Sequence, residues 1–234
     1  MSEFDRQQYA EQRRPHFNMK KPTVTYVLIG INLLMYILMT AIGYINDWGQ
    51  NLQLILFGAK VNELIDVGQV WRLLTCVFLH VGIAHLICNC YAIYVYGPVV
   101  ERLFGKARFL TIYIVGGIMG SLMSYAFSDA ASAGASGAIF GLIGCMFYFR
   151  EKYPDIFRRI FGRSLFIILG LNLLFGFIQP GIDNFGHIGG FIGGFVSAWV
   201  VGLLGEYVMP FKRIFAALVL AMIATGLFAV GVIF

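Results

Sequence analysis

The stretch TVTYVLIGINLLMYILMTAIGY, Thr23–Tyr44, decides the class of fold. It contains no charged residue, and it has the length needed to cross the hydrocarbon core of a bilayer, which takes about 20 mostly apolar helical residues. The whole chain has the same character, since 59% of its 234 residues are hydrophobic and only 12% are charged. A soluble domain carries about 25% charged residues. The sequence therefore predicts an integral membrane protein.

Six further apolar stretches follow, so we predict an all-α, polytopic transmembrane helical bundle with seven spans. The predicted spans are Thr23–Tyr44, Ile83–Leu103, Phe109–Phe127, Ser136–Phe149, Leu165–Ile178, Gly186–Leu204 and Ile214–Phe234. The fourth and fifth are short for a span. The polar start of the chain has no apolar stretch ahead of a cleavage site, so we expect no signal peptide.

The lysines and arginines predict the orientation, because cytoplasmic loops of membrane proteins are enriched in these residues. If every span crosses, fifteen of the 17 lie on one side, and only Lys60 and Arg72 lie on the other. We expect a bacterial cell-membrane protein with a cytoplasmic N-terminus and a C-terminus outside. The net charge of +5 then reflects topology. A nucleic-acid partner is not expected, since its footprint would cluster on one folded face.

We expect a single domain with three parts: a short cytoplasmic tail at 1–22, a helical core at 23–205 and an additional C-terminal helix at 206–234. The one sizeable loop, Ile45–Gly82, alternates apolar and polar residues. This alternation predicts short helices lying in the membrane interface. The four cysteines lack metal-ligand spacing and are predicted to be small core residues.

Polar residues inside spans are costly, which makes each of them a candidate for function. Ser136 opens the fourth span, and Arg150 follows too soon for a helix rising 1.5 Å per residue to cross a core about 30 Å thick. We therefore expect Ser136 below the outer surface, at the positive end of a helix whose free N–H groups can meet an oxyanion. Alternatively, the run Gly134-Ala135-Ser136-Gly137 only provides a close-packing surface.

His187 opens the sixth span, near the same outer side. Glycines recur every four residues on both spans, and such spacing lets helix backbones approach closely. These stripes are Gly137 and Gly141 on the fourth span, and Gly186, Gly190 and Gly194 on the sixth. If the stripes pack together, Ser136 meets His187, and a hydroxyl beside an imidazole is an activated nucleophile. The alternative is a capping histidine bonded to a loop.

His85 and Asn89 are four residues apart and share one face of the second span. Both lie at about the predicted depth of Ser136, and histidine and amide side chains are suitable oxyanion donors. The alternative is a hydrogen bond between helices. We expect no metal and no cofactor, because there is no His-Glu-x-x-His motif and no carboxylate beside these histidines within a span.

Together these motifs resemble the rhomboid intramembrane serine proteases, from about Trp71 to Phe195. The matching motifs, in order, are Trp71-Arg72, His80, His85-x-x-x-Asn89, Gly97, Glu101-Arg102-x-x-Gly105, Gly134-Ala135-Ser136-Gly137 and His187-Ile188-Gly189-Gly190. The seventh span resembles the subgroup with one helix added after a six-helix core. Where many relatives have a tyrosine that stacks on the histidine, this chain has Phe140, which can still stack.

The resemblance implies Ser136 as nucleophile and His187 as general base and then acid. It also implies an oxyanion site formed by His85, Asn89 and the Ser136 backbone N–H. Trp71-Arg72 would belong to a structural interfacial loop, and Glu101-Arg102 to a polar cluster bracing the second and third spans. Asp183, four residues before the histidine, is not expected to complete a triad, because the family works as a dyad.

The implied function is that of a serine endopeptidase cleaving transmembrane or juxtamembrane segments, with membrane-protein substrates and the lipid bilayer as partners. One alternative is a non-catalytic rhomboid-like protein that binds membrane clients; the presence of both Ser136 and His187 counts against it. Another is a transporter, but we find neither an inverted repeat nor charged midplane residues.

Overall fold

The computed structural model describes residues 21–179 and 181–233, so most of the predicted 1–22 tail and the last residue of the seventh span, Phe234, lie outside the described residues. Within the described ranges the chain is all-helical, with no strand and a single isolated bridge between Lys60 and Ser132. In chain order the elements are α2 Thr23–Ile45, α3 Gln50–Phe57, α4 Asn62–Asp66, α5 Arg72–Thr75, η1 Cys76–Phe78, α6 Gly82–Phe104, α7 Lys106–Phe127, α8 Ser136–Lys152, α9 Pro154–Ile160, α10 Ser164–Ile178, α11 Asn184–Val201 and α12 Pro210–Ile233.

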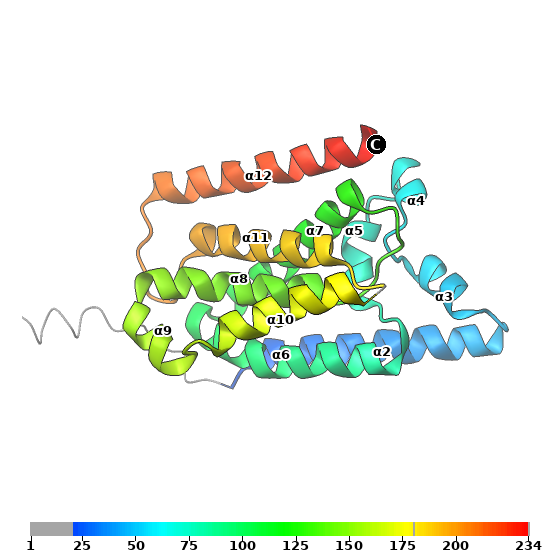
Figure 1. Ribbon diagram of the computed structural model, residues 1–234, viewed down its shortest axis with the longest axis horizontal. Helices are drawn as coiled ribbons and strands as arrows, with labels where there is room; N and C mark the ends of the chain where they lie inside the picture. The colour runs from blue at the N-terminus through cyan, green and yellow to red at the C-terminus, as the bar shows by residue number, and fades with distance from the viewer. Residues whose placement is uncertain (1–20, 180, 234) are drawn as a thin grey trace, which may run out of the picture.

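Each predicted span falls on one of the long helices, which run along the long axis of the molecule (Figure 1). Among the described residues, four helices are long and apolar enough to cross a membrane, namely α2, α6, α7 and α12. A bent pair, α9 with α10 at 71°, supplies a fifth if it is one span. The all-helical fold class is therefore confirmed, whereas the number of seven crossings stays a prediction.

Helices α7, α8 and α11 form the centre of the bundle, and glycines set their spacing. A Cβ atom added at Gly190 would lie 2.0 Å from the Gly137 carbonyl oxygen, and one at Gly194 would lie 2.0 Å from the Gly141 oxygen. The predicted contact between the two glycine stripes is thus confirmed. The neighbouring Gly189 instead faces α7, so α11 offers one glycine edge to each partner.

Glu101, near the C-terminal end of α6, is buried at 2% exposure and faces the start of α2. Its carboxylate accepts hydrogen bonds from the Val24 N–H at 3.1 Å, and from the Thr25 N–H and hydroxyl at 2.8 Å each. The first N–H groups of a helix need such acceptors, and a negative charge there is favourable. The expectation that this residue braces the second and third spans is wrong, because its partners belong to the first.

The long outer loop forms short helices, as predicted, and packs as one unit at the right-hand end of Figure 1. Arg72 lies almost fully buried within it and donates to the carbonyls of Ile55 at 2.8 Å and Ala59 at 2.9 Å. Thr75 donates to the Gly58 carbonyl at 2.7 Å. These bonds hold the loop to itself and support the structural role expected of Trp71-Arg72.

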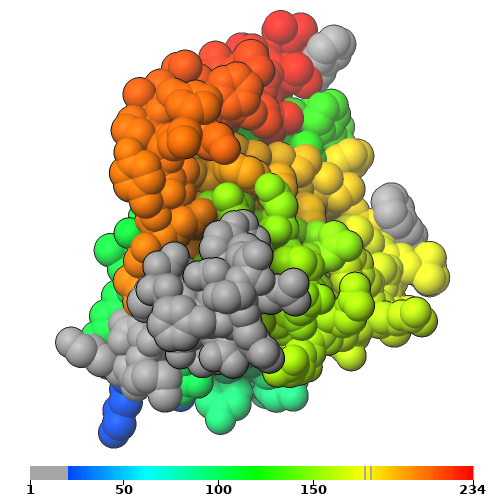
Figure 2. Space-filling model, turned by 90° about the vertical axis from the view of Figure 1, so that its left-hand side faces the viewer, coloured from blue at the N-terminus to red at the C-terminus, as the bar shows by residue number. Residues whose placement is uncertain are grey.

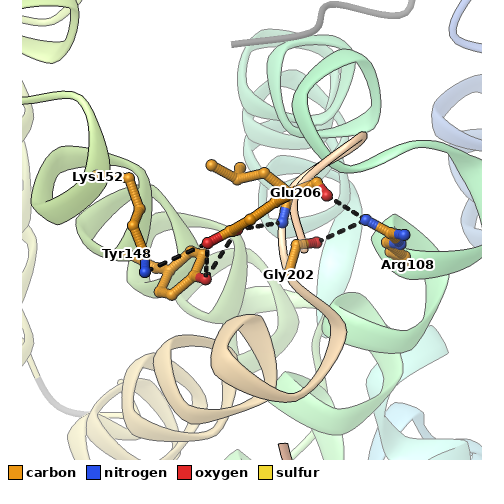
Figure 3. Close-up of polar contacts among 6 residues, drawn as sticks. Arg108, Tyr148, Lys152, Gly202 and Glu206 are labelled. Carbon is orange, nitrogen blue, oxygen red and sulfur yellow. Dashed lines mark hydrogen bonds and ion pairs between the residues drawn. The ribbon is translucent and has the colours of Figure 1, made fainter. Parts of the chain in front are cut away.

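The opposite end of the bundle carries the turn between α11 and α12, drawn in orange in Figures 1 and 2. Glu206 in this turn accepts from the Tyr148 hydroxyl at 2.8 and 2.9 Å and from the Leu203 N–H at 2.9 Å. Its carboxylate also pairs with Lys152 at 3.3 Å. Arg108 of α7 donates to carbonyls of the same turn (Figure 3). The turn is therefore tied to both α7 and α8.

The last helix, α12, covers α7 and α11 and meets the outer loop through one aromatic residue. The Tyr125 ring of α7 lies 5.8 Å from the Phe228 ring of α12, between centroids. A Cβ atom added at Gly231 would lie 2.3 Å from the same tyrosine. The Tyr125 hydroxyl donates to Asp66 in α4. One side chain thus joins the C-terminal helix to the loop on the outer end.

Candidate active site

Ser136 is the first residue of α8, and this helix begins without a side-chain cap. The residue before it, Ala135, is fully buried, and its side chain has no group that could accept a hydrogen bond. The helical ladder starts where the Ile139 N–H donates to the Ala135 carbonyl at 2.9 Å. The N–H groups of the first turn therefore have no side-chain acceptor, and the positive end of the helix lies at the serine.

His187 lies in the first turn of α11, buried at 7% exposure. Its ring stacks on Phe140, with centroids 4.2 Å apart and planes inclined by only 5°. Phe140 is one turn after Ser136 on α8. The stacking expected of this phenylalanine is confirmed, and it places the imidazole beside the first turn of the serine helix.

Backbone contact at the start of the two helices brings the two residues to the same end. A Cβ atom added at Gly137 would lie 3.3 Å from the Gly186 carbonyl oxygen. Each of these glycines is the chain neighbour of one candidate residue, Ser136 or His187. No hydrogen bond joins the two side chains in the described part of the chain, and the His187 Nδ1 is buried without a partner. Catalytic hydrogen bonds are often loose in ligand-free sites and tighten with substrate.

Asp183 lies just before α11 and caps it. Its carboxylate accepts from the Gly186 N–H at 2.8 Å, and its carbonyl accepts from the His187 N–H at 3.1 Å. A Cβ atom at Gly186 would lie 2.9 Å from this carboxylate, so the glycine leaves room for the cap. The carboxylate is committed to the helix N-terminus, which supports a dyad over a triad.

The two predicted oxyanion residues are placed differently. The His85 ring lies against the segment that precedes the serine, since a Cβ atom at Gly134 would lie 2.9 Å from its Nε2. Asn89 is buried at 5% exposure, but its amide donates to the His85 carbonyl of its own helix at 3.0 Å. The structure therefore places His85 beside Gly134, two residues before Ser136, whereas no hydrogen bond among the described residues connects Asn89 with the serine.

His80, in the loop before α6, supports His85 from behind. The two rings meet edge to face with centroids 5.3 Å apart. Both ring nitrogens of His80 are buried without a hydrogen-bond partner. Burial lowers the pKa of His80 to about 4, so this ring is neutral at physiological pH and adds no charge beside His85.

Similarity to known proteins identifies the family of the chain. The model of the rhomboid domain matches residues 67–204. The chain belongs to the rhomboid family. With this assignment and its several apolar helices, it is a multi-pass membrane protein. The family resemblance predicted from the motifs is therefore confirmed.

Three relatives illustrate the range of similarity. The rhomboid protease GluP of Bacillus subtilis is 44% identical over 225 residues, which cover 94% of this chain and 43% of GluP. The putative rhomboid protease YdcA of the same organism is 35% identical over 135 residues, 57% of this chain and 68% of YdcA. RHOMBOID-like protein 7 of Arabidopsis thaliana is 40% identical over 144 residues, 59% of this chain and 45% of the relative. The chain thus spans less than half the length of GluP and of the Arabidopsis protein.

Sequence reasoning missed two polar residues that make several contacts in this structure. Glu206 is the only acidic residue after Asp183, and this isolation was a signal that it has a specific partner. Lys60 was interpreted only as one of two cations on the outer side. Its position between Ala59 and Val61, among apolar residues, was the available signal that it is buried.

Proposed function

We propose that the chain is an intramembrane serine endopeptidase that cleaves transmembrane or juxtamembrane segments of membrane proteins. Ser136 is the nucleophile, and His187 is the general base and then the general acid. The observation that carries the proposal is the stacking of His187 on Phe140, one turn from Ser136 at the uncapped start of α8. The names of GluP and YdcA as rhomboid proteases support the same conclusion.

The reaction follows from these positions. The imidazole takes the proton of the Ser136 hydroxyl as its oxygen attacks the scissile carbonyl carbon, and an acyl-enzyme forms when the protonated imidazole gives the proton to the leaving amine. Water then attacks the acyl-enzyme with the same base. Charge develops on the carbonyl oxygen in both steps. The free N–H groups of the first turn of α8, with His85 and Asn89, stabilise that oxyanion.

We also propose seven crossings, with a cytoplasmic tail at 1–22, a core at 23–205 and a further helix at 206–234, in a bacterial cell membrane. Two observations support this topology. Helix α2 begins and α12 ends at opposite ends of the molecule, as an odd number of crossings requires (Figure 1). Helices α8 and α11 lie inside the bundle, where their glycines pack against neighbouring helices. Such helices can cross a membrane with fewer of the large apolar side chains that face lipid. The N-terminus is cytoplasmic and the C-terminus is outside.

Co-expression with tagged single-pass membrane proteins tests the proposed activity. The wild type should release a fragment and react with a fluorophosphonate probe. Neither Ser136→Ala nor His187→Ala should cleave the substrate, and Ser136→Ala should also fail to react with the probe. The double variant should be no worse than either single variant, because the two residues act as a unit. A wild type that binds the tagged protein without cleaving it or labelling would instead favour a non-catalytic binding protein.

Reporter fusions test the topology. We expect reporters that work only outside the cytoplasm to be active at Asp129 and Asp183, and reporters that work only inside to be active at Asp155. The opposite result at Asp155 would contradict the proposed orientation and the number of crossings together.

A further inference from the structure

Lys60, in the outer loop between α3 and α4, is fully buried at 0% exposure. Lysine is among the residues least often buried completely, because moving an ammonium group out of water is costly unless it is hydrogen-bonded. Burial lowers the pKa of Lys60, and the carboxylates of Asp183 and Asp129 oppose part of this shift. A side chain kept in so costly a place calls for a function.

The bonds of Lys60 all go to one segment, the residues 128–134 that lead from α7 into Ser136. Its Nζ donates to the Ser128 carbonyl at 2.6 Å and to the Ala130 carbonyl at 2.9 Å. Its backbone N–H donates to the Ser132 carbonyl at 2.9 Å, and its carbonyl accepts from the Ser132 N–H at 3.0 Å. One residue therefore holds every second carbonyl of the first part of this extended segment.

Few other contacts hold the segment. Asn62 donates to the Ser128 carbonyl at 3.3 Å, and the Gly134 N–H donates to the Cys76 carbonyl at 2.9 Å. Ala133 packs against the small apolar cluster that contains Ala59. The hydrogen-bonding partners named here lie in the outer loop, whereas the apolar cluster also contains Met39 of α2. Lys60 makes the largest share of the hydrogen bonds of the segment.

The segment ends where the proposed chemistry begins. Ala135 follows Gly134 directly and is the N-cap position of α8, and Ser136 is the first helical residue. Because α8 has no side-chain cap, the direction in which the chain enters the helix fixes how the Ser136 hydroxyl and the first N–H groups point. A shift of about 1 Å in such groups can cost about 10²-fold in rate.

We propose that Lys60 is a positioning residue of the protease: by holding residues 128–134 it sets the orientation of Ser136 and of the first turn of α8. This inference rests on the proposed function. It assigns Lys60 no contact with the substrate, and it predicts that its loss affects the chemical step more than substrate binding or folding.

The test replaces Lys60 by methionine in the full chain, because methionine has a similar length and no N–H donors. We measure kcat and KM for cleavage of a transmembrane substrate, the rate of fluorophosphonate labelling of Ser136, and Tm. Lys60→Met should lower kcat and the labelling rate by about 10- to 100-fold, as expected for a misplaced reactive group, with KM and Tm close to those of the wild type. Lys106→Met, the same change at an exposed lysine that opens α7, should match the wild type.

Asn62→Ala is a second, milder variant, since Asn62 makes only one of the bonds to the segment. It should lower the labelling rate by a smaller factor, and it decides the question if Lys60→Met does not fold. A Lys60→Met protein with wild-type kcat and labelling, or a drop in Tm alone, overturns the inference and leaves the protease intact. A wild type that neither cleaves nor labels at Ser136 overturns the proposed function itself, and the inference with it.

Discussion

Helices α8 and α11 begin side by side, yet their N-termini are finished in opposite ways. Asp183 caps α11 by accepting from the Gly186 N–H at 2.8 Å. Ala135 occupies the same position before α8 and offers no cap. An Ala in place of a capping residue costs about 1 kcal/mol. The capped helix carries His187, whereas the uncapped helix leaves N–H groups free beside Ser136, where the proposed reaction needs them.

We expect the largest effect on activity from a variant that separates the two helices. Gly190→Leu places a side chain where a Cβ atom would already lie 2.0 Å from the Gly137 oxygen. We expect cleavage and probe labelling to disappear, although no catalytic atom changes, and Tm to fall. Gly226→Leu is the control, because a Cβ atom at Gly226 meets nothing within 4 Å. Full activity in a folded Gly190→Leu protein would show that close contact of the helices is not required.

The Ala135→Ser variant gives α8 the side-chain cap that it lacks. In Ala135→Ser the new hydroxyl can accept from an N–H group of the first turn and so compete with the oxyanion. We expect kcat to fall by about 10²-fold, as for removal of one oxyanion donor, while Tm stays level or rises. Ala217→Ser, the same change at an exposed position of α12, is the control. If Ala135→Ser keeps its activity, the first-turn N–H groups do not stabilise the oxyanion.

The reverse change removes the cap of α11. Asp183→Ala should lower the free energy of unfolding by about 1 kcal/mol, whereas Asp183→Asn, which also caps well, should change it little. Both variants should keep most of their activity, because this carboxylate serves the helix. Thermal unfolding and the cleavage rate measure the two effects separately. Strong inactivation by Asp183→Asn with unchanged stability would indicate instead that the carboxylate acts on His187.

The smallest effect on activity is expected at the other end of α8. Tyr148→Phe removes the hydroxyl that donates to Glu206 at 2.8 and 2.9 Å. The loss of such a bond costs about 1 kcal/mol of stability. The kcat should remain close to that of the wild type, since Tyr148 lies about 18 Å along α8 from Ser136. A kcat that falls as far as in Ala135→Ser would mean that the inner end also controls the serine.

The long helices could be predicted from the sequence because a long apolar stretch forms a helix in a bilayer. For example, α6 begins at Gly82, one residue from the predicted Ile83. Partners far apart in the chain could not be predicted in this way. The partner helix of Glu101 was predicted wrongly. Its carboxylate accepts from N–H groups of α2 that lie 76 and 77 residues away in sequence.

The candidate site shows the same division. Ser136, His187 and the glycine stripes were found from their types and spacing, which report local helix geometry. Whether Asp183 caps a helix or orients a histidine depends on where its carboxylate points, and no pattern of residues specifies this. Likewise, counting charges assigned Lys60 to the outer side, a prediction, but could not show that its acceptors lie 68 and 70 residues away.

The contacts of Glu206 fix one end of α8, and this affects where Ser136 lies in membranes of different thickness. Helix α8 has 17 residues and is therefore about 25 Å long, with Ser136 at one end and the tied Lys152 at the other. In the proposed orientation, the Lys152 end of α8 lies at the cytoplasmic surface, and Ser136 lies at a fixed distance from that surface. Bilayers differ in thickness by a few ångström, and that difference is taken up entirely above the serine. For the proposed protease we therefore expect a thicker membrane to bring a deeper peptide bond of the substrate to the level of Ser136, so that lipid composition influences which bond is cut.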